Sequence, residues 1–322
     1  MSEKKRILTG DRTTGKLHLG HYVGSLQNRV KLQDEYESFI LLADIQALTT
    51  HFENPELLEH SIYEVAMDNL SVGLDPNKIT MVQQSRIPSI GELTVFYSML
   101  VSVNSLRHNP TIKTEAANYG YNDMTYGFLG YPVSQSADIT FCKANLVPVG
   151  EDQKPHMEMT RKIVRRFNEL YGETLVEPDT MLSDCPRLMG LDGNAIYLSD
   201  PAEEVRKKVM NAVTDATRIK KDDPGHPDVC VVSKYHKVFN SGEYANICES
   251  CKKGAIGCVA CKKALAAALN DLLEPFRERR AYYEAHRDEV REIILTGSEK
   301  ANQIGNETVK EVKEAMHIYI GD

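Results

Sequence analysis

Two histidines, His18 and His21, stand at the start of a predicted helix with Gly20 between them. A short apolar run at residues 5–9 comes before them and predicts a β-strand. The first turn of a helix has free backbone N–H groups and carries the positive end of the helix dipole, and both features favour phosphate. Gly15 and Gly20 have no Cβ, which lets a ligand approach the backbone. Taken alone, the segment is either a phosphate-binding loop or a glycine-containing turn with two surface histidines.

The composition is that of an ordinary soluble chain of 322 residues, long enough for two domains. No apolar run approaches the ~20 residues needed to cross a bilayer, and the N-terminus lacks the apolar core of a signal peptide. We therefore expect a cytoplasmic protein without a membrane partner. The net charge of −8 argues against nonspecific coating of nucleic acid, and we expect no DNA partner. A local basic patch, equally explained as a solvated helix face, consists of Arg161, Lys162, Arg165 and Arg166.

The first 85 residues alternate between strand-like and helix-like segments. Apolar runs and periodicity predict strands at 5–9, 38–43 and 78–83, and helices at 21–36 and from residue 54 onward. This order is typical of a doubly wound parallel sheet of the α/β class, whose ligands bind at the carboxyl ends of the strands. His18 and His21 lie at the first such end.

The rest of the chain changes from mixed to helical. Up to residue 184 we expect a helix over 90–106, a loop or lid over 109–130, a strand over 146–149, and a helix from Pro155 with Ile163, Val164, Phe167 and Leu170 facing inward. Beyond residue 200 we expect a helix over 201–215, a cysteine-bearing stretch over 226–261, a long helix broken near Pro275 and a last helix over 308–318.

Three blocks of sequence resemble one known family. The tetrad His-Leu-Gly-His, residues 18–21, is similar to the His-Ile-Gly-His signature of class I aminoacyl-tRNA synthetases, and the longer run 10–26 resembles the tryptophanyl-tRNA synthetases in particular. V-P-V-G-E-D-Q-K-P-H, residues 147–156, resembles the adenosine-binding loop of that family, and Y-P-V-S-Q-S-A-D-I, residues 131–139, its amino-acid pocket. The blocks stand in the family's order, and the resemblance covers most of the chain but weakens beyond residue 200.

The resemblance implies a Rossmann-like catalytic domain at 1–184, a helical tRNA-anticodon domain at 185–297, and a C-terminal helix at 298–322 that could pack back on the first. It also implies a homodimer that activates L-tryptophan with ATP and Mg²⁺ and transfers it to tRNA(Trp).

By resemblance, His18 and His21 contact the phosphate oxygens. Lys113, in the expected lid, is a further candidate for a phosphate contact. The implied ATP site consists of Arg12, Thr13, Thr14, Gly20, His21, Gly150, Glu151, Asp152 and Leu188. Glu151 and Asp152 could instead begin the next helix, where acidic residues are favoured. For Lys113 we favour the alternative of a plain surface lysine.

The implied tryptophan pocket consists of Gly10, Gln46, Tyr131, Gln135, Asp138, Val149 and Gln153. A carboxylate such as Asp138, in an apolar pocket, can accept a hydrogen bond from an indole N–H. It could also accept one from a tyrosine hydroxyl, so a tyrosyl-tRNA synthetase stays open as an alternative. Two residues depart from the family, because many members have Met at the position of Gln135 and His at that of Gln46.

A second signature of these enzymes, Lys-Met-Ser-Lys-Ser, is missing. It lies on a mobile loop that holds pyrophosphate and should follow residues 187–193, yet the chain has no lysine between Arg187 and Arg206. Either the printed sequence leaves out the loop, or the loop is deleted and activation is impaired. We favour the first interpretation because the rest of the site is intact. A true deletion would favour a catalytically silent RNA-binding protein on a synthetase fold.

Five of the seven cysteines lie between residues 230 and 261. Cys248, Cys251, Cys258 and Cys261 have a spacing that by itself predicts a tetrahedral zinc site. The set Cys230, Cys251, Cys258 and Cys261 resembles the [4Fe-4S] ligands of a subset of tryptophanyl-tRNA synthetases. On this resemblance we favour the second set, and iron–sulfur over Zn²⁺.

Overall fold

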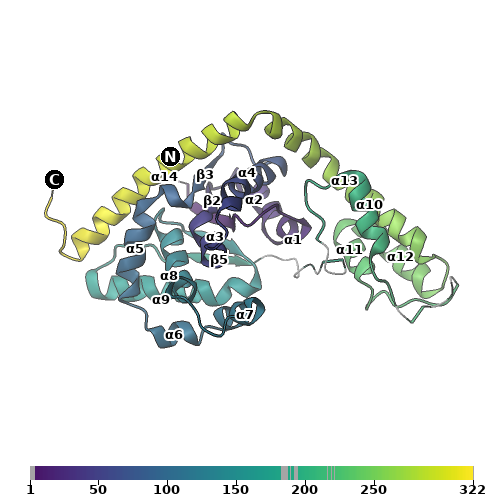
Figure 1. Cartoon of the computed structure of the whole chain (residues 1–322), viewed down its shortest axis with the longest axis horizontal. Helices are drawn as coiled ribbons and strands as arrows, with labels where there is room; N and C mark the ends of the chain where they lie inside the picture. The colour runs from purple at the N-terminus through teal and green to yellow at the C-terminus, as the bar shows by residue number, and fades with distance from the viewer. Residues whose placement is uncertain are drawn as a thin grey trace.

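The computed structural model describes residues 4–182, 188, 190, 191, 195–215, 217, 218, 220 and 222–321, without the side chain of Asp152. Within these residues lies a parallel sheet of five strands in the order β3-β2-β1-β4-β5 (Figure 1). The strands are β1 (Arg6–Arg12), β2 (Glu37–Ala43), β3 (Ile79–Gln83), β4 (Leu146–Val149) and β5 (Asp179–Leu182). The strand order reverses between β1 and β4, which is where doubly wound sheets bind their ligands. The predicted α/β class is confirmed.

Helices cover both faces of the sheet. They are α1 (Leu19–His21), the π-helical turn η1 (Tyr22–Leu26), α2 (Gln27–Leu32), α3 (Asp44–His51), α4 (Glu56–Ser71), the 3-10 turn η2 (Gln84–Arg86), α5 (Pro88–Ser98), α6 (Val103–Arg107), α7 (Pro110–Tyr119), α8 (Tyr126–Thr140), the 3-10 turn η3 (Glu151–Gln153) and α9 (Lys154–Tyr171). The expected helix over 90–106 is thus two helices, α5 and α6.

Successive side chains of β2 enter two different cores. Phe39 and Leu41 pack with residues of α5, α8 and α9, while Ile40 and Leu42 pack on the other face with residues of α4. A strand buried on both faces needs a continuous apolar run, which is why the sequence of β2 shows no alternation. On α9 the expected inward residues are buried except Leu170, which lies near the end of the helix and is exposed.

The segment 109–130, which we expected to be a loop or lid, is mostly helical. α7 begins where the Asn109 side chain accepts hydrogen bonds from two backbone N–H groups of the first turn, with Pro110 next in sequence. It ends at Gly120, whose φ of 69° is the left-handed conformation that favours glycine. Residues that we interpreted as loop formers are therefore helix caps, and the prediction of a loop is wrong.

The later part of the chain is helical, with α10 (Ala202–Asn211), α11 (Val231–Phe239), α12 (Ser241–Lys252), α13 (Cys258–Ala285) and α14 (Arg287–Ala315). Figure 1 shows α10, α11 and α12 with the start of α13 as an arm beside the sheet. α13 continues through Pro275, so the predicted break is wrong. A proline can be kept inside a helix that tertiary packing stabilises, and Leu273 and Phe276 on either side of it are buried.

α14 lies against the edge strand β3 and against α5 (Figure 1). A Cβ at Gly297 would lie 2.0 Å from the carbonyl oxygen of Met81, so the helix approaches the strand only because this residue is glycine. α14 begins at Arg287, well before residue 308, where we expected the last helix to begin. The prediction missed its first part because small residues such as Gly297, rather than large apolar ones, pack on the strand. α14 is continuous across residue 298, where the third predicted segment begins. The division into 1–184, 185–297 and 298–322 stays a prediction. No helix in the described part of the chain is long and apolar enough to cross a membrane.

Candidate active site

The tetrad at residues 18–21, called the signature segment below, follows the carboxyl end of β1. His18 is the N-cap of α1. Nδ1 of His18 accepts a 3.1 Å hydrogen bond from the backbone N–H of Gly20, and Nδ1 of His21 accepts one of 3.2 Å from the backbone N–H of His18. When neutral, both rings therefore carry their proton on Nε2. The ring centroids are 4.0 Å apart, so the segment offers two neighbouring N–H donors in a fixed orientation.

Burial favours the neutral form of both imidazoles. Desolvation, together with the charge of His21, lowers the pKa of His18 to about 4. Desolvation also lowers the pKa of His21, although the carboxylate of Asp11 opposes this effect. At neutral pH the pair can thus donate hydrogen bonds through Nε2–H to phosphoryl oxygens whose charge changes during a reaction.

Asp11 fixes the end of β1 to the helices behind it. Its carboxylate accepts hydrogen bonds from Nη1 and Nη2 of Arg29, at 2.5 and 3.0 Å, and Arg29 also donates to Asn69 at 2.8 Å. Burial raises the pKa of Asp11, but the adjacent Arg29 guanidinium holds it below its usual value. The aspartate is therefore charged and paired, and it supports the backbone from which the histidine segment starts.

Three predicted ATP contacts, Arg12, Thr13 and Thr14, form the turn after β1. Nη2 of Arg12 donates a 2.6 Å hydrogen bond to the hydroxyl of Thr50 on α3. The hydroxyl of Thr13 is fully buried and has no hydrogen-bond partner among the described residues. Thr14 is exposed. The turn therefore presents backbone and one exposed hydroxyl, while its two other side chains point into the protein.

Gly20 is required by the position of the His18 ring. A Cβ on Gly20 would lie 2.8 Å from Cε1 and 2.9 Å from Nδ1 of His18. The carbonyl oxygen of Leu188 lies 3.9 Å from the same Cβ position. The structure thus places the Leu188 backbone beside the signature segment, and its role in ATP binding stays a prediction.

The predicted adenosine block begins within β4, which pairs with β1 in the sheet, and continues beyond it. Gly150 leads into η3, and α9 begins directly after it. The carboxylate of Glu151 is exposed and binds Lys154 at 2.8 Å. The block thus begins a helix and also ends the strand beside the signature segment, so both interpretations of Glu151 are compatible with the fold. The side chain of Asp152 lies outside the described structure.

Lys113 does not join this site in the described structure. It lies exposed on α7, and no described contact connects it with His18 or His21. The alternative interpretation, a surface lysine, fits its position.

A buried carboxylate, Asp138 of α8, forms the centre of the predicted amino-acid pocket. Its Oδ1 atom accepts a 2.8 Å hydrogen bond from Nε2 of Gln84. Burial raises the pKa of Asp138 to about 7, with Gln84 lowering it and the charge of Asp44 raising it further. Gln84 is its only hydrogen-bond partner among the described residues, so Oδ2 is available to accept a hydrogen bond from a substrate.

Gln84 also connects this carboxylate to Gln46 and Tyr131. The Gln84 side-chain oxygen accepts a 3.0 Å hydrogen bond from the backbone N–H of Gln46. The side-chain Nε2 of Gln46 lies 3.4 Å from the carbonyl oxygen of Tyr131. The Tyr131 hydroxyl lies 2.9 Å from Nε2 of His156. These contacts unite three of the predicted pocket residues.

The other predicted pocket residues stand around the ends of β1 and β4. Nε2 of Gln135 donates a 3.3 Å hydrogen bond to Oε1 of Gln153. Val149 is half-buried at the end of β4. Gly10 pairs with Leu41, and a Cβ at Gly10 would lie 2.5 Å from the Leu41 carbonyl oxygen. Close packing on β2 is therefore one reason for this glycine.

Sequence reasoning missed Gln84 and His156. Gln84 directly follows β3, and the polar side chain after a buried strand was a usable signal because ligands bind at that edge of the sheet. His156 ends the adenosine block, but its contact with Tyr131 depends on how α8 packs against α9. That packing has no signature in either segment alone.

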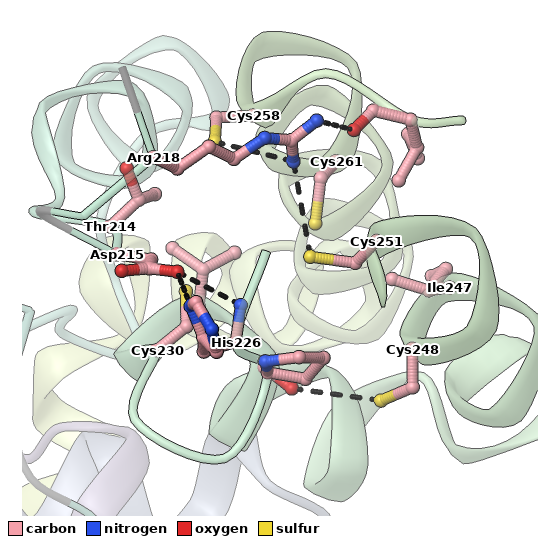
Figure 2. A pocket seen from close by; sticks show the side chains of 14 residues that line it. Thr214, Asp215, Arg218, His226, Cys230, Ile247, Cys248, Cys251, Cys258 and Cys261 are labelled. Atoms are coloured by element: carbon pink, nitrogen blue, oxygen red, sulfur yellow. Dashed lines mark hydrogen bonds and ion pairs between the residues drawn. The ribbon is translucent and has the colours of Figure 1, made fainter. Parts of the chain in front are cut away.

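The five cysteines of the arm line one pocket (Figure 2). All are free thiols. Arg218 reaches between two of them, with Nη1 at 3.9 Å from Sγ of Cys251 and at 3.9 Å from Sγ of Cys258. Cys248, outside the favoured set, lies in the same pocket near Ser233, at 3.8 Å. In the described part of the chain, no group of three or more His, Cys, Asp or Glu residues is placed to hold a metal ion.

Burial disfavours the thiolate form of two of these cysteines, Cys251 and Cys261. Burial, followed by the neighbouring cysteines, raises the pKa of Cys261 to about 12. Burial also raises the pKa of Cys251, although Arg218 opposes this shift. Neighbouring thiolates in one pocket would repel one another, so a cation among them favours their ionisation.

The chain matches the family described as tRNA synthetases class I (W and Y) over residues 1–274. Among curated proteins, it is 49% identical over 335 residues to the tryptophan–tRNA ligase of Streptococcus mutans, and 50% identical over 335 residues to that of Streptococcus pyogenes serotype M1. Both alignments cover 98% of this chain and 98% of the relative. An alignment of 335 residues exceeds the 322 residues of this chain, so the relatives contain residues with no counterpart here.

Among solved structures, the chain is similar to tryptophanyl-tRNA synthetase from Campylobacter jejuni complexed with ADP and tryptophan. The TM-score is 0.85 at 26% identity, and the match covers 97% of this chain and 99% of that one. The similarity therefore extends over the sheet, the arm and α14.

Proposed function

The chain belongs to the class I tRNA synthetases for tryptophan and tyrosine, and we propose that it is a tryptophan–tRNA ligase. It activates L-tryptophan with ATP and transfers the tryptophanyl group to tRNA(Trp), and we propose the cytoplasm as its location. The observation that carries the proposal is the pair of oriented Nε2–H donors at the end of β1, where the strand order reverses. The names of both relatives support the choice of tryptophan.

Activation joins a carboxylate oxygen of tryptophan to the α-phosphorus of ATP and breaks the bond from that phosphorus to the bridging oxygen of pyrophosphate. His18 and His21 donate hydrogen bonds to the phosphoryl oxygens, whose charge redistributes in the transition state. The exposed turn at Thr14 and the end of β4 hold the nucleotide in line with the amino acid, and such positioning supplies much of the rate. Mg²⁺, bound with ATP, offsets charge on the leaving pyrophosphate.

Asp138 orients the amino-acid side chain. Its free Oδ2 accepts the indole N–H, while Gln84 holds Oδ1. The indole N–H can only donate, so an acceptor at this point suits it. A tyrosine hydroxyl could also donate to Oδ2, and the experiment must therefore compare both amino acids.

ATP–pyrophosphate exchange with tryptophan and with tyrosine, on protein of verified mass, tests the proposal. We expect exchange with tryptophan alone and a loss of about 10²-fold in His18→Ala without a change in tryptophan affinity. Exchange with tyrosine alone would overturn the choice of substrate. Tryptophan binding without any exchange would favour the catalytically silent interpretation.

We infer that Cys230, Cys251, Cys258 and Cys261 hold a [4Fe-4S] cluster, with Zn²⁺ as the alternative. The convergence of all four on one pocket and the guanidinium of Arg218 among them support a group of thiolates there. A Cβ at Gly225 would lie 2.6 Å from Sγ of Cys251, so the backbone is shaped to admit this sulfur. Iron, sulfide and zinc analysis of protein purified without oxygen tests the inference, and absence of all three would overturn it.

We also infer that two copies pair through the exposed side of α5. Val95 on this helix, Met99 at its C-cap and Val103 on α6 are 56%, 69% and 56% exposed, although all three are large apolar residues. Exposed apolar groups of this kind are typical of protein interfaces. The remaining partner, tRNA(Trp), is proposed from the relatives' names and from the arm, which resembles the anticodon domain of this family.

A further inference from the structure

A buried chain of contacts links the helical arm to the signature segment. Nη1 of Arg280 on α13 donates a 2.6 Å hydrogen bond to Oδ1 of Asp68 on α4. Oδ2 of the same carboxylate accepts a 2.7 Å hydrogen bond from the backbone N–H of Leu17. Leu17 immediately precedes His18. One carboxylate thus joins a side chain of α13 to the backbone that carries the first imidazole.

These groups are removed from solvent. Arg280 is 3% exposed, Asp68 0% and Leu17 2%. Nη2 of Arg280 also binds the carboxylate of Glu64 at 2.7 Å. Burial raises the pKa of Asp68 to about 6 even though Arg280 and the Leu17 N–H both lower it. Such a pair is screened little by salt, and removal of one partner leaves the other unpaired in the interior.

Leu17 is held from its other side as well. Its carbonyl oxygen accepts a 3.0 Å hydrogen bond from the backbone N–H of Leu198, and the N–H of Leu19 donates to the carbonyl oxygen of Ile196 at 2.9 Å. The N–H of Leu17 therefore depends on α4 and its C=O on the segment 195–198. The backbone of His18 lies between these two supports.

α13 makes a second contact near the tetrad. The ring of Phe276 lies 5.2 Å from that of Tyr22, which directly follows His21. Phe276 and Arg280 are four residues apart on one helix and so face the same side. α13 thus contacts the residues flanking the tetrad on both sides, through Asp68 at one end and directly at the other.

We propose that Arg280 is a positioning residue for ATP binding, which acts through Asp68 on the backbone of Leu17 and so sets the two imidazoles relative to the phosphates. The inference rests on the proposed function.

The neighbouring residue Arg279 provides a matched control. Its Nε atom donates a 2.6 Å hydrogen bond to the carbonyl oxygen of Ser71, so it joins the same two helices without bonding to Asp68. A role in merely holding α13 on α4 would be shared by Arg279. A role that acts through Asp68 would not, although Arg279 also lies over the ring of Phe276, 5.6 Å from its centroid.

The test measures ATP affinity by calorimetry in the presence of tryptophanol, which has no carboxylate and cannot form an adenylate. Tryptophan affinity is measured by ligand fluorescence, because the protein contains no tryptophan. The variants are Arg280→Gln, Asp68→Asn, their double mutant, Arg280→Lys and the control Arg279→Gln. Thermal unfolding identifies the variants that remain folded.

We expect Arg280→Gln and Asp68→Asn each to weaken ATP binding about tenfold, with tryptophan binding unchanged. The double mutant should be no weaker than the single variants, because both act through one contact. Arg280→Lys should recover part of the loss, and it serves as the test if the other variants fail to fold. Wild-type affinity in folded variants, or an equal loss in Arg279→Gln, would overturn the inference. Failure of the wild type itself to bind ATP would instead overturn the proposed function.

Discussion

Nε2 of Gln84 donates a 2.8 Å hydrogen bond to Oδ1 of Asp138, and both side chains are almost completely buried. The contact joins the end of β3 to α8. It fixes one oxygen of the carboxylate and leaves the other for the amino acid, so the site is oriented before substrate arrives.

Gln84→Leu should weaken tryptophan binding about tenfold, because a buried carboxylate loses the donor that orients and stabilises its charge. Ligand fluorescence gives the affinity directly. The control is Gln33→Leu, which removes another buried amide, one whose partners are Val30, Gly73 and Asp75. Similar losses of tryptophan affinity in both variants would show that the effect is general destabilisation.

Tryptophan affinity should increase with pH, because burial raises the pKa of Asp138 to about 7 and the ionised form is the better acceptor. We expect up to about tenfold between ~pH 6 and ~pH 8. Folding stability should change in the opposite direction. The unfolded carboxyl titrates near 3.8, so the folded state binds more protons, and stability falls as pH rises from there to about 7.

Asp138→Asn should remove both trends, since the amide does not titrate. Affinity at three pH values and the free energy of unfolding across the same range provide the measurement. A flat affinity profile for the wild-type protein would contradict the assignment of Asp138 to the pocket.

Gly20→Ala should reduce ATP affinity about tenfold, because the new Cβ would lie 2.8 Å from the His18 ring and turn it away. Gly24→Ala is the matched control, since a Cβ there meets nothing within 4 Å. Calorimetry with tryptophanol present compares the two. If Gly20→Ala bound ATP as well as Gly24→Ala, the orientation of His18 would be irrelevant to binding.

If the loop is truly deleted, insertion of Lys-Met-Ser-Lys-Ser between Asn194 and Ala195 should increase the rate of pyrophosphate exchange by on the order of 10²-fold. The added ammonium groups would stabilise the leaving pyrophosphate. An insertion of five glycine and serine residues controls for loop length. Equal rates for the two insertions would mean that this position does not approach the phosphates.

Met99→Glu should convert a dimer to a monomer at micromolar concentration, because a charge at the centre of an apolar contact must be desolvated. Light scattering during size-exclusion chromatography measures the mass. Leu170→Glu changes an exposed leucine on α9, 46% accessible, and should leave the mass unchanged. A monomeric wild-type protein would contradict the proposed pairing.

Much of the fold could be predicted because its signals are local. The buried run of β2 and the start of α9, with Pro155 in its first turn, are examples. The predictions of secondary structure were wrong where packing between residues distant in sequence determines whether a segment is helical. Pro275 stays helical because the residues on either side of it are buried. α14 packs on the edge strand β3 through small residues such as Gly297, so the sequence there lacks the large apolar residues that usually mark a packed helix.

The candidate site divides in the same way. His18 and His21 could be found because two imidazoles and a glycine lie within four residues of one another. Gln84 and His156 reach their partners Asp138 and Tyr131 only through the packing of helices on the sheet. Residues that act through others are separated in sequence from the groups they position.

The close approach of α14 to β3 has a consequence for how the chain matures. Ser298 accepts a hydrogen bond from the backbone N–H of Gln83, and Gly297 lies against Met81, so the helix occupies the edge where another strand could add. During synthesis that edge is complete long before the residues that cover it leave the ribosome. The nascent chain therefore passes through a stage in which an open strand is exposed to self-association, and this final helix closes it.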